Sequence, residues 1–232
     1  RDAQESRGLG DVYKRQTGIQ IDQLGDEMNP AIKLPPVRND LRLIGQNIPH
    51  NSRVLDVGCG NGQMLEWLFQ TKNCSGAGVE RDDVEVLQAM QRGIPVLDMD
   101  IDAELGQLEA DSFDVVVLSR TLQAVLRPDL TLSALRQLAP TIILTMPNFG
   151  YYQNRWRLLS GHMPRSKDLP YTWYETPNLH HTTMVDLEPL FEKVNLRVTK
   201  RIPLSEQGRR LRAGNIWPNL RAGAVLYVLQ RS

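Results

Sequence analysis

The chain of 232 residues has no surplus charge and few cysteines. Its 27 Lys and Arg balance 27 Asp and Glu, so it lacks the excess of basic side chains that displaces counterions from nucleic acids or anionic membranes. Cys59 and Cys74 are too few for a disulfide framework or a four-thiolate metal site, and no metal is expected. No apolar run approaches the ~18 residues of a membrane span, and no signal-peptide pattern opens the chain. These absences predict a cytoplasmic protein that binds neither nucleic acid nor membrane.

The first 38 residues are also short of regular patterning. They show neither a period near 3.6 nor alternation, and Pro30, Pro35 and Pro36 interrupt any helix or strand. Residues 1–16 read like translated adapter sequence. We therefore expect residues 1–38 to be disordered or non-native, and residues 39–232 to form one domain.

From Asn39 onward, helix-like and strand-like segments alternate. Val84, Leu87 and Met90 are expected to face inward from one of the helices, and Thr183 resembles a helix cap. Most strand candidates are apolar without polar alternation, as in strands buried on both faces of a parallel sheet. This order predicts an α/β fold with a doubly wound, mostly parallel, seven-stranded sheet. Helices are expected at 39–48, 62–70, 82–92, 129–138 and from 183, and strands at 53–57, 75–80, 94–97, 113–119, 141–146, 197–202 and 224–229.

The most informative segment is VLDVGCGNG, residues 54–62, in which an apolar strand leads through three glycines into a helix. Glycines let the backbone turn tightly and approach a ligand, and the helix that follows presents free N–H groups. The dinucleotide pattern G-x-G-x-x-G would need a small residue where Gln63 stands. Asp56 at the strand end would repel a pyrophosphate. It suits the ammonium group of S-adenosylmethionine, which has no phosphate.

Two further acidic residues follow the next two strands. Glu80 ends the second strand, where a carboxylate can accept hydrogen bonds from ribose hydroxyls. Asp100 follows the third strand, where it could accept from an adenine amino group while Ile101 packs on the ring; Asp98 and Asp102 lie nearby in the sequence as alternatives.

This constellation resembles the class I S-adenosylmethionine-dependent methyltransferases over roughly residues 41–229. The resemblance implies a Rossmann-like fold with S-adenosylmethionine as the cofactor. In such folds the residue after the fourth strand, here Ser119, lies beside the transferable methyl group. The residues that the resemblance assigns to cofactor binding are Asp56, Gly58, Cys59, Gly60, Asn61, Gly62, Glu80, Arg81, Asp100, Ile101 and Ser119.

Aromatic residues concentrate after the fifth strand, in an insertion at about 149–182. Seven of the chain's 14 lie between Phe149 and Tyr174, interleaved with basic residues. Three interpretations stay open: core packing at the sheet edge, a lid over a substrate pocket, or a surface for a partner. The candidates for substrate or partner contacts are Gln123, Asn148, Tyr152, Trp156, Trp173 and Tyr174.

Three longer sequence segments narrow the resemblance to one family. LSRTLQAVLRPD, TMPNFGYYQNRWRLLSGHMP and LPYTWYETPNLHHTT resemble the MetW family of methionine biosynthesis proteins, from about Asn39 to the region of Pro203. This resemblance implies a methyltransferase-fold protein that supports the acetyl- or succinyl-transferring homoserine O-acyltransferase. An active small-molecule methyltransferase is the alternative.

The sequence leaves catalytic residues unassigned. No base lies among residues 119–123 or at Asn148, and His180 and His181 are the nearest candidates. No G-x-S-x-G nucleophile elbow is present, so we do not expect the chain to transfer an acyl group itself.

Overall fold

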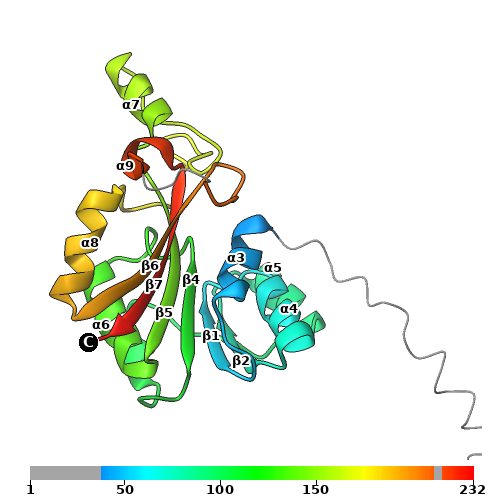
Figure 1. Ribbon diagram of the computed structural model, residues 1–232. Coiled ribbons are helices and arrows are strands. Elements are labelled where there is room, and N and C mark those ends of the chain that lie inside the picture. Colours follow the sequence, from blue (N-terminus) through cyan, green and yellow to red (C-terminus); the bar gives the residue numbers. More distant parts are fainter. Residues whose placement is uncertain (1–37, 212–215) are drawn as a thin grey trace, which may run out of the picture. The chain divides into compact units, whose positions relative to one another are not determined.

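The computed structural model describes residues 38–211 and 216–232. Helices cover both faces of one sheet (Figure 1). The expectation of a disordered or non-native N-terminal segment concerns residues that lie outside this description, apart from Arg38. The described elements are α3 (Asn39–Gln46), β1 (Arg53–Val57), α4 (Gln63–Lys72), β2 (Ser75–Val79), α5 (Asp83–Gln91), β3 (Val96–Leu97), η2 (Leu105–Gln107), β4 (Val115–Ser119), α6 (Pro128–Leu138), β5 (Thr141–Pro147), α7 (Tyr152–Leu159), α8 (Met184–Lys193), β6 (Leu196–Leu204), α9 (Pro218–Arg221) and β7 (Ala224–Arg231).

The seven strands follow the order β3-β2-β1-β4-β5-β7-β6. Strands β1 to β5 are parallel to their neighbours among themselves, and β7 is antiparallel to both β5 and β6. The predicted doubly wound, mostly parallel sheet is therefore confirmed, and β7 makes it mixed. The strand order reverses between β1 and β4. In open α/β sheets this switch point, at the carboxyl ends of the strands, is where ligands bind.

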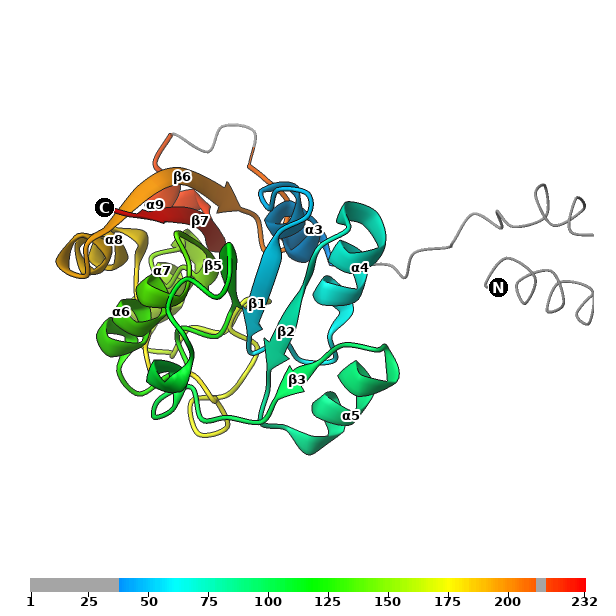
Figure 2. The same cartoon turned by 90° about the horizontal axis from the view of Figure 1, so that it is seen from below.

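Alternate residues of the central strands pack on opposite faces of the sheet. Val54 and Val115 pack in the core formed with α3, α4 and Ala89 of α5, whereas Leu55 and Val116 pack in the core formed with α6 and α8. Figure 2 shows these two helix layers from below, with the sheet between them. The absence of polar alternation in the strand sequences follows from this arrangement, because both faces are covered.

Helix α5 presents to the sheet a different face from the expected one. Val84, Leu87 and Met90 were predicted to face inward, but they are 62%, 60% and 60% exposed, so that prediction is wrong. Ala89 is fully buried, and a Cβ added at Gly62 would lie 3.1 Å from its Cβ. The close approach of the small Ala89 to the glycine loop sets the rotation of the helix. Met90, Leu87 and Val84 lie about 100°, 160° and 140° around the axis from Ala89 and therefore face outward.

Local signals explain the start of α8. Thr183 is its N-cap, and the Thr183 hydroxyl accepts a hydrogen bond from the backbone N–H of Asp186, as the sequence predicts. Helix α7 stands apart from the two helix layers, beyond the carboxyl end of β5 (Figure 1). Among the described residues, no helix is both long and apolar enough to cross a membrane.

Gly76 in β2 offers a test of the packing between β1 and β2. Its φ is +144°, and a Cβ there would overlap the backbone carbonyl oxygen of Val54. We expect Gly76→Ala to lower the free energy of unfolding by about 3 kcal/mol or more, because backbone atoms cannot move aside without breaking the ladder. Gly106→Ala is the matched control, since its Cβ meets nothing within 4 Å. Urea unfolding of both variants measures the difference, and equal stabilities would contradict this explanation.

Candidate functional site

The loop after β1 is built from left-handed glycines. Gly58, Gly60 and Gly62 have φ of +76°, +53° and +75°, values that residues with a Cβ rarely adopt. A Cβ at Gly58 would lie 2.5 Å from the Thr121 hydroxyl oxygen. The backbone N–H groups of Gly58 and Cys59 both donate to the carbonyl of Val79, at 2.8 and 3.0 Å. These bonds fix the loop against the end of β2, with its backbone open toward α3.

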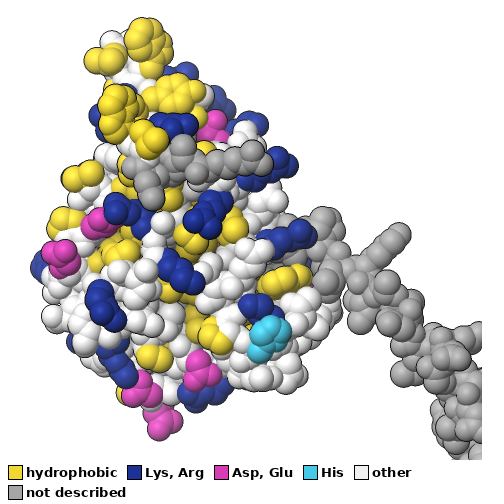
Figure 3. Space-filling view, viewed as in Figure 1, with side chains coloured by type: hydrophobic (Ala, Val, Ile, Leu, Met, Phe, Trp, Pro, Cys, Tyr) yellow, Lys and Arg dark blue, Asp and Glu magenta, His cyan; other side chains and the backbone are white. Residues whose placement is uncertain are grey.

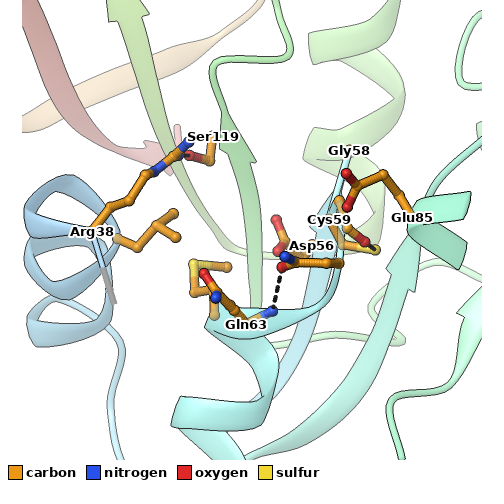
Figure 4. A pocket seen from close by; sticks show the side chains of 11 residues that line it. Arg38, Asp56, Gly58, Cys59, Gln63, Glu85 and Ser119 are labelled. Atoms are coloured by element: carbon orange, nitrogen blue, oxygen red, sulfur yellow. Dashed lines mark hydrogen bonds between the residues drawn. The ribbon is translucent and has the colours of Figure 1, made fainter. Parts of the chain in front are cut away.

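A cavity of about 490 Å³ lies between this loop and α3, at the carboxyl ends of β1 and β4. Figure 4 shows Arg38 reaching toward Ser119 on one side, Glu85 on the other, and Asp56 between them. The volume of the cavity falls within the range of small-molecule pockets, roughly 300 to 1,000 Å³. The lining residues are Arg38, Leu41, Asp56, Gly58, Cys59, Gly60, Asn61, Gln63, Met64, Glu85 and Ser119.

Asp56 is the unusual group of this cavity. Its side chain belongs to a residue only 2% exposed, and its Oδ1 has no hydrogen-bond partner among the described residues. Burial, and then the nearby charge of Glu80, raise the pKa of Asp56 to about 7, against the opposite effect of Arg38. A buried acceptor without a donor carries a free-energy cost that a ligand with an N–H group can remove.

The structure divides the residues predicted to bind a cofactor into two groups. Asp56, Gly58, Cys59, Gly60, Asn61 and Ser119 line the cavity, and Gly62 caps α4 directly after them. Glu80, Arg81, Asp100 and Ile101 are not among its lining residues. They lie beyond the ends of β2 and β3.

Glu80 holds the glycine loop after β1 through hydrogen bonds to backbone N–H groups. Its Oε2 accepts from the backbone N–H of Gly60 at 2.9 Å, and its Oε1 accepts from those of Arg81 and Asp82. Arg81 approaches Asp100 at 3.9 Å, and Ile101 packs against the core on the α6 side of the sheet. Glu80 thus orders the glycine loop, in addition to any contact that it makes with a ligand.

Sequence reasoning missed five residues of the cavity: Arg38, Leu41, Gln63, Met64 and Glu85. Arg38 belongs to the segment of residues 1–38 that was expected to be disordered or non-native, yet its Nη2 donates to the Ser119 hydroxyl at 3.4 Å. Leu41 and Met64 have the spacing of ordinary core positions, so the sequence carries no signal of their place. Glu85 was recognisable only as an acid in the first turn of α5.

Arg120 joins α3 to the aromatic insertion. It follows Ser119 with a φ of +60°, its Nε lies 3.4 Å from Asp40 of α3, and its Nη2 donates to Asp168 at 2.6 Å. Both carboxylates are nearly inaccessible, Asp40 being 3% and Asp168 4% exposed. Burial raises the pKa of Asp168 to about 6, despite the opposing charge of Arg120. One guanidinium therefore lies between the carboxylates of two elements that are distant in sequence, and Arg38 gives Asp40 a second cation at 3.3 Å.

Gln123 and Asn148 make internal hydrogen bonds, Gln123 with the insertion and Asn148 with the segment of α9. Asn148 is 1% exposed and donates both amide hydrogens to backbone carbonyls, those of Asn219 and Ala222. Gln123 is 5% exposed, and its backbone carbonyl accepts from the N–H groups of Leu179 and His180. Neither lines the 490 Å³ cavity, nor does His180 or His181.

The four aromatic candidates of the insertion are at the surface. Tyr152, Trp156, Trp173 and Tyr174 are 51%, 72%, 74% and 68% exposed. Core packing therefore explains Tyr151, which is 8% exposed, but not these four side chains. None of the four lines the 490 Å³ cavity.

Comparison with known proteins gives a family match and a curated relative. The family described as methionine biosynthesis protein MetW matches residues 38–229. A bifunctional methionine biosynthesis protein MetXA/MetW from Rhodopirellula baltica is 31% identical over 217 residues, which cover 88% of this chain and 35% of that protein. The chain thus spans about a third of the length of this relative.

Solved structures share the fold. An S-adenosylmethionine-dependent methyltransferase from Archaeoglobus fulgidus matches with a TM-score of 0.61 and 17% identity, covering 82% of this chain and 91% of that one. The magnesium protoporphyrin IX methyltransferase of Synechocystis, solved with bound S-adenosylhomocysteine, matches with a TM-score of 0.55 and 18% identity, covering 82% and 78%. At these identities the likeness establishes the class I methyltransferase fold.

The raised pKa of Asp56 predicts a pH dependence of stability. An acid whose pKa is higher in the folded than in the unfolded state binds more protons when folded, so stability falls as pH rises from about 4 to about 7. Each proton contributes a slope of at most about 1.4 kcal/mol per pH unit. Asp56→Asn should flatten the decline between pH 5 and pH 7 in urea unfolding of the ligand-free protein. Parallel curves for the variant and the wild type would refute the assignment.

Proposed function

Because the chain belongs to the MetW family of methionine biosynthesis proteins, we propose that it binds S-adenosylmethionine in the 490 Å³ cavity and supports a homoserine O-acyltransferase. The proposal that the cavity binds this ligand rests on one observation: the Oδ1 of Asp56 is buried and lacks a hydrogen-bond donor among the described residues. The proposal of a partner rests on the bifunctional MetXA/MetW relative. The free thiols of Cys59 and Cys74 agree with a cytoplasmic setting for this protein.

The cavity residues suit this cofactor. Asp56 would accept hydrogen bonds from the ammonium group of the methionyl moiety, which would also supply the missing counter-charge. The left-handed glycines allow the backbone of the loop to approach the ligand, and no basic side chain of the loop offers a phosphate site. Arg38, on the far side of the cavity, would face the ligand's carboxylate (Figure 4). When bound, S-adenosylmethionine supplies a methyl group on a positively charged sulfur.

The partner part of the proposal comes from the curated relative. Its name joins MetXA and MetW in one chain, of which the part similar to this protein makes up 35%. We take MetXA to be the homoserine O-acyltransferase that the family resemblance implies. A covalent link keeps two domains at high local concentration. Where they are separate chains, binding between them would serve the same end.

The first test compares ligands with and without an amino-acid group. Asp56→Asn removes the charge with little change of shape, so we expect the dissociation constants of S-adenosylmethionine and S-adenosylhomocysteine to rise roughly 10- to 100-fold, as for a lost charge-assisted hydrogen bond. 5′-Methylthioadenosine has no ammonium group, and its affinity should change less than about twofold. Isothermal titration calorimetry measures all three constants. An equal loss for all three ligands would show that Asp56 acts on the loop rather than on the ammonium group.

The second test concerns the partner. We expect the full chain to form a complex with the homoserine O-acyltransferase from the same organism, and to raise its rate of acyl transfer in a mixture of the two purified proteins. Size-exclusion chromatography and a thiol-release assay measure the two effects. Absence of both would disprove the partnership. Formation of S-adenosylhomocysteine with a small-molecule extract as acceptor would instead support the alternative, an active methyltransferase.

A further inference from the structure

We propose that the exposed apolar side chains of α7 and of the loop after it form the docking surface for the acyltransferase, an inference that rests on the proposed function. The α7 surface, as we call it, consists of Tyr152, Trp156, Leu159, Met163, Trp173 and Tyr174. The partner that it fits presents an apolar pocket with an acidic margin.

Helix α7 is oriented contrary to the usual rule for surface helices. Tyr152, Trp156 and Leu159 follow the spacing i, i+4, i+7 and form one stripe, yet they are 51%, 72% and 82% exposed. The helix buries only Asn154, whose amide donates to the backbone carbonyl of Asn148 at 3.2 Å. A polar residue thus attaches the helix while its apolar face points to solvent, where such a stripe normally marks an interaction site.

The loop continues the apolar stripe. Met163 and Trp173 line a common hollow, and the ring of Trp173 meets that of Tyr174 edge to face at 5.5 Å. The hydrophobic side chains gather around α7, with basic side chains at their margin (Figure 3). Trp and Tyr are the residues that most often carry the binding energy of an interface, because large rigid rings lose little conformational entropy on binding.

The charges around the α7 surface identify the kind of partner. Arg155, Arg157, Arg165 and Lys167 are exposed, whereas Glu175 is the only exposed acid among residues 149–182. In a symmetric dimer through this surface, each basic side chain would meet basic side chains of the second copy. The balance of charge therefore favours a different protein with an acidic margin. The fused relative indicates which protein accompanies this domain.

Helix α5 supplies a matched control surface. Val84, Leu87 and Met90 form an exposed apolar stripe on one helix, but acidic residues of the first turn, Asp83 and Glu85, accompany it. An acidic margin would repel the partner that the basic α7 surface attracts. Substitutions on α5 therefore test whether any loss of binding is specific to α7.

The experiment measures binding of the full chain to the acyltransferase by biolayer interferometry. We expect the Trp156→Ala/Trp173→Ala variant to raise the dissociation constant at least 30-fold, and Leu87→Ala/Met90→Ala to change it less than twofold. Arg155→Glu/Arg157→Glu should slow association and weaken its salt dependence. Thermal unfolding and S-adenosylmethionine affinity of the two alanine variants should equal those of the wild type, because the substituted side chains are exposed and none lines the cavity. The arginine variant also loses hydrogen bonds from Arg155 to Gly150 and from Arg157 to Met163, so its binding is compared only after its own thermal unfolding has been measured.

Several outcomes would overturn the proposal. If the wild type binds the acyltransferase and the double tryptophan variant binds equally well, the α7 surface is not the interface, although the partnership stands. If the wild type does not bind, the proposed partnership fails as well. Self-association, RNA binding or vesicle binding that the tryptophan variant alone abolishes would assign the surface to a second copy, a nucleic acid or a membrane instead.

Discussion

Asp56 is fixed in the middle of the sheet, paired with Gly78 of β2 and Val117 of β4, and this placement governs the ligand side of the molecule. The carboxyl group is buried there, so its charged form is disfavoured unless a neighbour or a ligand supplies a donor or a counter-charge. Its partner Gly78 leaves room for the side chain of Cys59 in the glycine loop, because a Cβ at Gly78 would overlap Cys59. The glycine loop, the tie from Glu80 to Gly60 and the position of α3 all serve to keep an open space in front of this one group.

The signals that predicted the fold are local ones. β1 is recognisable because five consecutive residues, Arg53–Val57, precede three glycines, and the structure places the strand at those positions. The cap at Thr183 is equally local. The rotation of α5 is not, because it depends on contact between Ala89 and a loop more than twenty residues earlier in the chain. An apolar residue at every third position fits either face of such a helix.

In the candidate site, too, residues with a local sequence signal could be predicted, and residues placed by tertiary packing could not. The loop residues could be named from the sequence, since glycine spacing and a strand-end acid are visible within nine residues. Arg38 and Glu85 reach the cavity from α3 and α5, and only tertiary packing brings them there. Asn148 was a candidate for contact with a substrate or partner because it follows β5, and only the structure shows that its amide donates to carbonyls at α9. The zero net charge of the chain likewise hides an acid-containing cavity and a basic, aromatic face.

Arg120 gives these two parts a common counter-ion. Asp40 belongs to α3 and Asp168 to the insertion, so moving either element away from Arg120 would break a buried ion pair, although Asp40 would keep Arg38 at 3.3 Å. The two elements therefore resist separate displacement. The consequence is one of thermodynamic linkage: if a ligand in the cavity shifted α3 and thereby changed the affinity of the insertion for a second molecule, that molecule would change the affinity for the ligand by the same factor. Such an arrangement would couple the occupancy of the cavity to binding at the insertion.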